Sequence, residues 1–171
     1  MKTDGQQIRL RAMEPEDLDV LYRIENDVEL WDVGATNVPY SRYVLHDYIA
    51  NASGDIYADR QVRLIVEGPD GTVVGLVDLT NFDPKHRRAE LGLVVERPHR
   101  RKGFARRVLL HIEHYARTVL HLHQIYAVIA ADNAAACSLF RAAGYDQVAC
   151  LPQWIASDSG FRDAIVMQRL L

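Results

Sequence analysis

The sequence predicts an α/β (α+β) domain built on a mixed sheet of about seven strands, with helices on both faces. Apolar strand patterns come singly and in hairpins, and helical patterns lie between them. At 171 residues, of which 49% are hydrophobic, the chain can bury a sizeable core. No internal repeat or low-complexity linker divides it, so we expect residues 1–171 to form a single domain.

The first third of the chain predicts a strand and two helices. Ile8–Arg11 alternates like a strand, and Pro15 suits the first turn of an amphipathic helix. Val28–Tyr40 mixes Gly, Asn, Pro and aromatic residues, which indicates a loop. A second helix is expected to begin at Ser41, a residue that caps helix N-termini well.

The middle of the chain predicts three strands. Gln61–Glu67 and Thr72–Thr80 are separated by Gly-Pro-Asp-Gly, a strong hairpin signal. Asn81–Arg88 is expected to form the next turn. Ala89–Val95 is apolar and β-branched at its end, which predicts a mostly buried strand closed by Pro98.

A long amphipathic helix is expected from Gly103 to about Leu120. Its apolar residues recur at helical spacing, and its basic residues fall on the opposite side. The apolar set is Val108, Leu109, Ile112, Tyr115, Ala116 and Val119.

The last third predicts a strand, a helix and a terminal hairpin. Gln124–Ile129 is the strand, and Asp132-Asn133 caps a helix over Ala134–Ala143 that Gly144 stops. The two hairpin strands are expected at Val148–Trp154 and Ala164–Leu170, with a turn at Ser157–Gly160 between them.

Charge is unevenly distributed along the chain. Residues 85 to 107 hold nine Lys and Arg against two Glu, a local net charge of +7 in a chain whose formal net charge is −3, so the remainder carries −10. A basic island in an acidic molecule favours a localised phosphate ligand over a broad nucleic-acid surface. The acidic remainder suits a cationic substrate, although acidic surfaces also serve solubility.

Composition also bounds where the protein works. No apolar run approaches the roughly 20 residues of a membrane span, and the polar start is no signal peptide. Cys137 and Cys150 form no Cys-x-x-Cys arrangement, so free thiols are expected. We therefore expect a soluble cytoplasmic protein that acts on neither membranes nor nucleic acid.

The basic turn between the strand ending at Val95 and the helix after Gly103 is the strongest candidate binding site. A helix N-terminus directs free N–H groups and the positive end of its dipole at one point, which favours an anion. Gly103 can adopt backbone angles closed to other residues, and Ala105 is small enough for a phosphate to approach the main chain. An ordinary solvated basic turn is the alternative interpretation.

Two motifs give this turn a family context. Arg100-x-x-Gly103-x-Ala105 resembles the Arg/Gln-x-x-Gly-x-Gly/Ala signature of the GNAT superfamily of acyl-CoA N-acetyltransferases. The block from Asn133 to Tyr145 resembles the family's second signature, an Asn that opens a helix ending in Leu-aromatic-x-x-x-Gly-aromatic. Both occur in the family's order, so the chain is identified as a member of that superfamily, nearest to the bacterial spermidine/diamine and ribosomal-protein N-terminal acetyltransferases.

The resemblance implies a fold and a cofactor site. The GNAT fold splays its fourth and fifth strands, here Ala89–Val95 and Gln124–Ile129, around the pantetheine arm of acetyl-CoA. A main-chain N–H in that fourth strand would also polarise the acetyl carbonyl. The cofactor residues implied are Leu93, Val94, Val95, Arg100, Arg101, Lys102, Gly103, Phe104, Ala105, Asn133 and Phe140; core packing alone is the alternative for the side chains of Leu93 and Val95.

Two carboxylates are candidates for the general base. A substrate ammonium with a pKa near 10 must lose a proton before it attacks a thioester. Glu90 and Asp78 occupy acidic positions that resemble those of the spermidine and diamine enzymes. Alternatively, Glu90 only pairs with Arg87 or Arg88, and Asp78 is an exposed carboxylate at a strand end.

Phe140 departs from the family pattern. Many members carry a Tyr there, whose hydroxyl is placed to protonate the departing sulfur. A thiol pKa of roughly 8.5 makes departure as thiolate near neutral pH cost only about 2 kcal/mol, so turnover can proceed without that acid. The resemblance thus implies that Phe140 lines the thiol pocket and that solvent donates the proton.

Four histidines cluster late in the long helix and after it, yet they do not predict a metal site. His111 and His114 lie off the apolar face, and no Cys or carboxylate completes a closed ligand set with His121 and His123. We therefore expect no metal.

These observations predict an acetyl-CoA-dependent N-acetyltransferase that moves the acetyl group to a primary amine by direct attack in a ternary complex. The acceptor is left open among a small amine, an amino sugar and a peptide N-terminus. Asp32–Tyr40 has a single carboxylate where the polyamine enzymes carry several, which argues against spermidine specifically. A homodimer or higher homo-oligomer is expected, and the rival hypotheses are a non-catalytic acyl-CoA-binding sensor and, more remotely, a nucleic-acid-binding protein.

Overall fold

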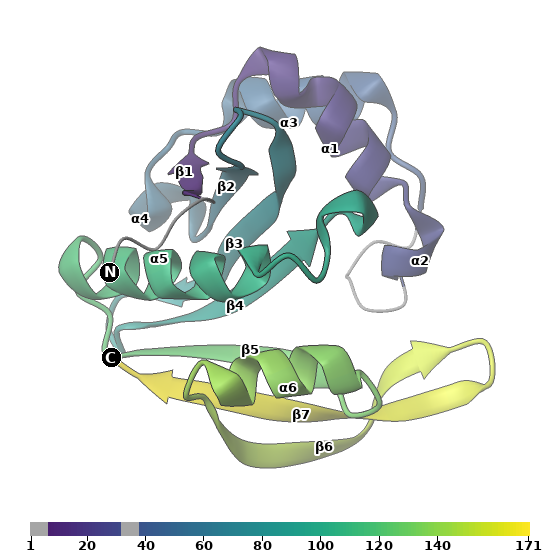
Figure 1. Cartoon of the computed structure of the whole chain (residues 1–171), viewed down its shortest axis with the longest axis vertical. Coiled ribbons are helices and arrows are strands. Elements are labelled where there is room, and N and C mark those ends of the chain that lie inside the picture. The colour runs from purple at the N-terminus through teal and green to yellow at the C-terminus, as the bar shows by residue number, and fades with distance from the viewer. Residues whose placement is uncertain (1–6, 32–37) are drawn as a thin grey trace. The chain divides into compact units, whose positions relative to one another are not determined.

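The fold is described here from a computed structural model, which describes residues 7–31 and 38–171. The chain forms two compact units (Figure 1). The first unit comprises the residues through Met13 together with Gly54–Ile125 and Leu171, and the second comprises Glu14–Ser53 and Tyr126–Leu170. The expectation of a single domain stays a prediction.

Four antiparallel strands form the sheet of the first unit. They are β1 (Arg9–Arg11), β2 (Val62–Glu67), β3 (Val73–Asp83) and β4 (Arg88–Val95), each paired with the next in the chain. The predicted hairpin between β2 and β3 is confirmed, with the Gly68 N–H donating to the Thr72 carbonyl at 2.8 Å. In the middle of this pair, Val77, Leu79, Ala89 and Leu91 are buried on one face, whereas Asp78, Thr80 and Glu90 lie on the other, more polar face and are partly exposed.

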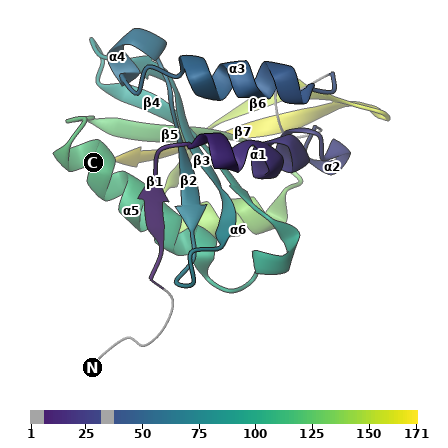
Figure 2. The same cartoon turned by 90° about the horizontal axis from the view of Figure 1, so that it is seen from above.

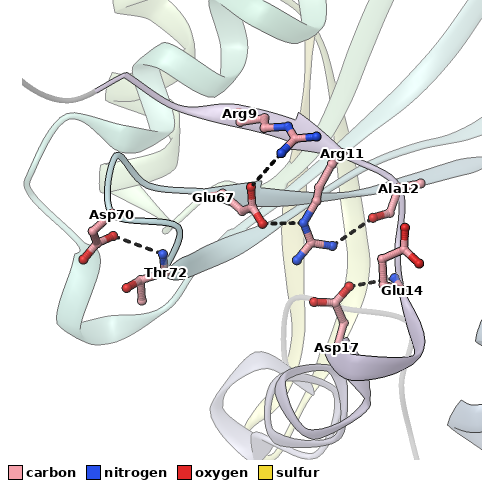
Figure 3. A network of polar contacts seen from close by, with 8 residues as sticks. All are labelled: Arg9, Arg11, Ala12, Glu14, Asp17, Glu67, Asp70 and Thr72. Atoms are coloured by element: carbon pink, nitrogen blue, oxygen red, sulfur yellow. Dashed lines mark hydrogen bonds and ion pairs between the residues drawn. The ribbon is translucent and has the colours of Figure 1, made fainter.

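An ion-pair network holds the short strand β1 on β2. Glu67 at the end of β2 accepts a hydrogen bond from Nε of Arg11 and lies 3.8 Å from Nη1 of Arg9, as Figure 3 shows. Two arginines therefore share one carboxylate, which fixes the register of a strand only three residues long.

The strand β3 is longer than predicted, and the expected turn over Asn81–Arg88 is wrong in its first part. Thr80 faces Glu90 and Asp83 faces Arg88, so β3 advances three residues while β4 advances two. The extra residue is a β-bulge with Asn81 in the left-handed region at φ 49°. An Asn that tolerates this conformation is indistinguishable in sequence from a turn residue, which explains the error.

One long helix covers the buried face of this sheet. α5 (Phe104–Thr118) lies along β4 in Figure 1 and buries Val108, Leu109 and Ile112 completely. The helix ends two residues before the predicted boundary, and Val119 beyond it is 59% exposed. The first unit also contains α4 (Ile56–Asp59) and the 3₁₀ turn η2 (Arg97–His99), neither of which was predicted.

The helices near the N-terminus belong to the second unit. The turn η1 (Pro15–Asp17) leads into α1 (Leu18–Glu25), which lies beside α3 (Arg42–Asn51) in Figure 2. Ser41 caps α3 as predicted, because its side chain accepts a hydrogen bond from the Val44 N–H. A further helix, α2 (Val28–Trp31), lies at the start of the predicted loop Val28–Tyr40, and residues 32–37 of that loop lie outside the described residues.

The second unit also holds the C-terminal elements. α6 (Ala134–Ala142) is followed by a hairpin of β6 (Asp146–Ser157) and β7 (Gly160–Leu170), which turns where predicted but has longer strands. β5 (Gln124–Ala130) begins at the end of the first unit and continues in the second. Across the described residues, no helix combines the length and the apolar character that crossing a bilayer requires.

Candidate functional site

The basic turn after β4 has the geometry of an anion site. Gly103 lies in the left-handed region at φ 80° and is the N-cap of α5, with no side chain to cap the helix. The N–H groups of the first turn, starting with Phe104 and Ala105, have no acceptor within the helix. Since α5 is 15 residues long, its dipole adds positive potential at this end.

One side chain of the basic turn is buried and anchors it, and three charged side chains are exposed. Phe104 is only 5% exposed and contacts the His99 ring edge-on, with ring centroids 6.2 Å apart. Arg100, Arg101 and Lys102 are exposed to solvent. The turn is therefore fixed through its apolar residue while its cations remain accessible.

Arg100 has a structural partner that sequence analysis missed. Its Nε donates to the Val95 carbonyl at 2.8 Å, so this side chain connects the basic turn to the last residue of β4. Arg101 adopts φ 60°, a left-handed conformation two residues before Gly103. Such alternation of backbone conformation curls successive N–H groups toward one concavity.

The end of β4 presents main-chain groups on the side away from β3. The Glu96 N–H donates to the Val74 carbonyl at 2.9 Å, so in an antiparallel ladder this pair and every second pair before it are hydrogen-bonded. Leu93 and Val95 alternate with these pairs, and their N–H and C=O groups consequently point away from β3. This is the orientation that a main-chain contact with pantetheine requires.

Side-chain exposure changes along β4. Ala89 and Leu91 are at most 4% exposed, whereas Leu93, Val94 and Val95 are half-buried. Leu93, Val94 and Val95, which were predicted to contact the cofactor, are thus less buried than Ala89 and Leu91 earlier in the same strand. Ala89 and Leu91 are therefore core residues, whereas Leu93 and Val95, for which core packing was the alternative, are only partly buried.

Gly75 explains how closely β3 approaches the same part of β4. A Cβ built on Gly75 would lie 2.0 Å from the Val94 carbonyl oxygen, so no residue with a side chain fits there without moving the backbone. The sequence contains this glycine in the middle of a strand pattern, which is a signal of close backbone approach.

The two candidate carboxylates lie on the polar face of the sheet, on neighbouring strands. Asp78 faces Gly92 and Glu90 faces Thr80 across the β3–β4 pair, which makes Asp78 and Glu90 diagonal neighbours. Gly92 contributes no side chain, so space is left beside Asp78 on this face.

Asp78 is part of a two-fold ion pair. Nε and Nη2 of Arg63, the residue opposite it on β2, donate to its two carboxylate oxygens at 2.7 and 2.8 Å. Both side chains are about one-fifth exposed, at 19% and 22%. The alternative of an exposed carboxylate at a strand end is wrong, because Asp78 lies in mid-strand and is paired.

Glu90 has a neutral partner instead. Its Oε2 accepts a hydrogen bond from the side-chain amide of Asn81 at 2.7 Å, and the residue is half-buried. The suggested partners bond elsewhere: Nε of Arg87 donates to the His121 carbonyl, and Arg88 pairs with Asp83 at 3.3 Å. The two carboxylates therefore have different electrostatic environments although they are close in the sheet.

Asn133 and Phe140 belong to the second unit. Asn133 caps α6 as predicted, with its Oδ1 accepting from the Ala136 N–H at 3.1 Å. Phe140 is 5% exposed and contacts the Tyr145 ring edge-on, with centroids 4.9 Å apart. Capping thus accounts for Asn133 locally, and its predicted role toward the cofactor stays a prediction, as does that of Phe140.

Arg63 and Asn81 are the polar partners that the sequence prediction did not name. The predicted hairpin between β2 and β3 already implied that Arg63 lies near Asp78, because its turn sets the register of the two strands. No comparable signal existed for Asn81, since its position depends on the bulge.

Three ionisable groups of the described residues have displaced pKa values. The His86 backbone N–H, which donates to Asp83, is the main cause that lowers the pKa of that carboxyl, and the Thr72 N–H likewise lowers the pKa of Asp70 (Figure 3). Partial burial raises the pKa of Tyr115. Asp70 lies in a turn, Asp83 at the end of β3 and Tyr115 on α5, and none is a candidate catalytic residue, so these shifts concern stability.

The histidines after the middle of α5 are exposed, namely His111, His114, His121 and His123. Within residues 7–31 and 38–171, no group of three or more His, Cys, Asp or Glu side chains could hold a metal ion.

Comparisons with known proteins give this geometry its family. Residues 7–146 match the family described as acetyltransferase (GNAT) domain. The spermidine N(1)-acetyltransferase of Vibrio cholerae is 30% identical over 139 residues, which is 81% of this chain and 79% of that protein. The Escherichia coli K12 enzyme of the same name is 29% identical over 161 residues, 94% of this chain and 84% of that one.

Solved structures agree over nearly the whole fold. A crystal structure of the V. cholerae spermidine N-acetyltransferase in complex with CoA and spermine has a TM-score of 0.84 at 28% identity, covering 96% of this chain and 95% of that one. A dodecameric structure of the same enzyme has a TM-score of 0.81 at 28% identity and covers 96% of this chain and 94% of that one. The predicted GNAT fold is confirmed, and the chain belongs to the GNAT acetyltransferase family as an acetyl-CoA-dependent N-acetyltransferase.

Proposed function

We propose that this N-acetyltransferase transfers the acetyl group of acetyl-CoA to a primary amine of a polyamine. The observation that carries the acceptor class is the similarity to two spermidine N(1)-acetyltransferases over 81% and 94% of the chain. An acceptor with several positive charges also suits a chain that is acidic outside its basic turn.

Glu90 is the general base in this proposal. Its hydrogen bond from Asn81 occupies one oxygen with a neutral donor, so the carboxylate keeps its negative charge and can accept a proton through the other. The acceptor ammonium gives up one proton to Glu90, directly or through a water, and its neutral nitrogen then attacks the thioester carbonyl. The nitrogen of the resulting tetrahedral intermediate loses a second proton to solvent. The carbon–sulfur bond then breaks, and the thiolate takes its proton from solvent.

Asp78 supports the site without acting as the base. Both of its oxygens accept from Arg63, and the guanidinium offsets its charge, so protonation of Asp78 would break a bidentate pair. We propose that this ion pair stabilises the pairing of β2 with β3 on the polar face of the sheet, beside Glu90.

The cofactor site is proposed on the basic turn and the end of β4. The main-chain N–H groups from Arg101 to Ala105 hold the pyrophosphate, with Arg101 and Lys102 adding charge. Main-chain groups of Leu93 and Val95 contact the pantetheine, and one N–H between them stabilises the oxygen of the tetrahedral intermediate. Arg100 fixes the turn through its hydrogen bond to the Val95 carbonyl. Asn133, Phe140 and Val94 remain proposed cofactor-binding residues.

One sequence feature argues against spermidine itself. Asp32–Tyr40, of which residues 32–37 lie outside the described residues, has one carboxylate where the family resemblance implies that polyamine enzymes carry several. A polyamine acceptor is therefore proposed as a class, and the assay must separate its members.

Steady-state release of free CoA thiol tests the proposal. The acceptors are spermidine, spermine, a diamine, an amino sugar and a short peptide with a free N-terminus. We expect kcat/KM for at least one polyamine to exceed that for the amino sugar and the peptide by tenfold or more. Turnover only with the sugar or the peptide would contradict the acceptor class, and acetyl-CoA binding without thiol release from any amine would favour the sensor.

We also propose that the chain forms a homo-oligomer. The support is the dodecameric form of the V. cholerae relative, which shares the fold at a TM-score of 0.81. Light scattering coupled to size-exclusion chromatography would measure the mass, and a mass of one 19.4 kDa chain over the micromolar range would contradict the proposal.

A further inference from the structure

The β-bulge in β3 lies beside Glu90. Between Thr80 and Asp83 one residue more is present on β3 than on β4, and Asn81 occupies the bulge at φ 49°. This conformation is costly for most L-residues and least so for Gly, Asn and Asp. Asn is thus one of few residues with a side chain that fits this backbone.

The bulge changes the face on which Asn81 lies. In a regular strand Asn81 would follow Val77 and Leu79 onto the buried face, because side chains alternate, and those two residues are 1% and 0% exposed. Instead its amide Nδ2 lies 2.7 Å from Oε2 of Glu90, which is on the polar face. Bulges commonly redirect a side chain in this way near active sites.

The neighbouring residue anchors the bulge. Phe82 is 4% exposed, contacts the Tyr57 ring edge-on with centroids 5.0 Å apart, and donates its N–H to the Arg60 carbonyl at 3.1 Å. The fold therefore fixes Phe82 inward and Asn81 toward Glu90. These Phe82 contacts anchor the backbone beside Asn81 without involving the hydrogen bond to Glu90.

We propose that Asn81 is a positioning residue that holds the Glu90 carboxylate in its catalytic orientation. The inference rests on the proposed role of Glu90 as general base. Asn81 fixes one carboxylate oxygen, and the remaining oxygen faces the acceptor amine.

The neutrality of the donor matters to this role. Arg63 binds both oxygens of Asp78 and offsets the carboxylate's negative charge with its own positive charge. An amide donor orients Glu90 while leaving a net negative charge next to the substrate cation. The same sheet face thus contains one carboxylate paired for structure and one held for proton transfer.

Four variants test this role by thiol release with acetyl-CoA and the polyamine that the wild-type protein acetylates fastest: Asn81→Gly, Asn81→Asp, Glu90→Gln and the double variant Asn81→Gly/Glu90→Gln. Gly and Asp both tolerate the left-handed backbone, so the bulge is kept while the donor is removed or replaced by a carboxylate. Asn51→Gly is the matched control, because it removes an exposed Asn amide that donates to the Asp47 carbonyl within α3.

We expect Asn81→Gly to lower kcat by roughly ten- to a hundredfold, the range of a hydrogen bond to a charged group, with the KM for acetyl-CoA unchanged. Asn81→Asp should lower kcat further, because two carboxylates then face each other. In the Glu90→Gln background Asn81→Gly should have no further effect, which a general loss of structure could not reproduce.

The outcomes separate the two proposals. If Glu90→Gln lowers kcat but Asn81→Gly does not, the positioning role is wrong and the base assignment stands. If Glu90→Gln leaves kcat unchanged, the base assignment fails and the positioning role fails with it. If Asn81→Gly lowers kcat equally in both backgrounds, Asn81 acts on the fold and not through Glu90.

Discussion

At the scale of single residues, the partners of a carboxylate decide its role. Asp78 and Glu90 share a sheet face, yet one is bound by a guanidinium and the other by an amide. Both were candidates of equal weight in the sequence, because a predicted hairpin brings Arg63 near Asp78 but does not show that the two side chains pair. The geometry supports different roles for the two.

Substitution of Asp78 should mainly affect stability. Asp78→Asn keeps the shape but removes the charge that Arg63 binds, and charge-assisted hydrogen bonds contribute about 1.5–3 kcal/mol. For a chain of this length that corresponds to a fall in Tm of about 3–12 °C. We expect kcat of Asp78→Asn to change less than about threefold at a temperature where the variant is folded. Glu90→Gln should instead lower kcat strongly and change Tm little. A loss of kcat as large as that of Glu90→Gln would make Asp78 the base.

Phe140 offers a test of the leaving-group step. Phe140→Tyr adds the hydroxyl that many relatives use and changes the side chain by one oxygen. If the ring lies beside the thiol, kcat should rise when thiolate departure limits the rate, with a ceiling of about thirtyfold set by the roughly 2 kcal/mol cost of departure. The gain should fade as the pH rises through the thiol pKa near 8.5.

The same variant can contradict the placement of Phe140. The residue is 5% exposed and contacts Tyr145, so a hydroxyl that meets only apolar atoms would be an unsatisfied buried group. A drop in kcat that does not depend on pH, measured together with a lower Tm, would mean that the ring packs away from the sulfur.

At the scale of elements, the sequence predicted what has a strong local signal. The hairpin of β2 and β3, the Ser41 cap of α3 and the Asn133 cap of α6 are confirmed. The helices α2 and α4 were missed because four residues are too few to show a helical period. The end of β3 was missed because Asn81 in a bulge has the same composition signal as a turn.

The basic turn can be tested as an element through Gly103. Gly103→Asp puts a negative charge at the N-terminus of α5, whereas Gly103→Asn adds a neutral side chain of nearly the same size, and both residues tolerate a left-handed backbone better than other side chains do. We expect the Asp variant to raise the KM for acetyl-CoA at least about tenfold, equal to roughly 1.4 kcal/mol, and the Asn variant to raise it several-fold less. An unchanged KM in the Asp variant would mean that the turn binds no phosphate.

The turn between β3 and β4 should contribute to acid stability through Asp83. The His86 N–H, 3.0 Å away, lowers the pKa of Asp83 in the folded state below its ordinary value of 3.8. The unfolded chain therefore binds more protons near that pH, so the stability from Asp83 is fully present above pH 3.8 and is lost as the pH falls through the lower folded pKa. Asp83→Asn should flatten the acid limb of stability against pH without changing the limb above neutrality, measured by urea unfolding at successive pH values. An identical acid limb in the variant would contradict this account.

At the scale of the whole molecule, charge and fold point to the same ligand. The chain has a net charge of −3, yet nine of its 20 Lys and Arg lie within the segment from Lys85 to Arg107, which contains the turn before α5. Composition alone predicted a phosphate ligand there, and the family match over residues 7–146 supplies acetyl-CoA as the co-substrate. The sequence did not predict how the side chains of the basic turn are oriented. The hydrogen bond from Arg100 to the Val95 carbonyl, for example, depends on where β4 ends.

Thermal shifts with truncated cofactors should identify which phosphates the protein uses. A ligand at about 100 times its Kd stabilises the folded state by about 2.7 kcal/mol, which corresponds to a rise in Tm of about 5–11 °C for a chain of this size. Acetyl-CoA should give the largest shift, dephospho-CoA a smaller one and pantetheine the smallest at equal concentration, because each step removes phosphate charge.

The size of each step distinguishes the groups. If the N-terminus of α5 holds the pyrophosphate, the larger loss falls between dephospho-CoA and pantetheine, since only that step removes the pyrophosphate. Added salt should then reduce the shift from acetyl-CoA while leaving that from pantetheine nearly unchanged, because screening acts on the charged part alone. Equal shifts from all three ligands would contradict the pyrophosphate site, and a loss confined to the step from acetyl-CoA to dephospho-CoA would move the role of the basic turn to the 3′-phosphate.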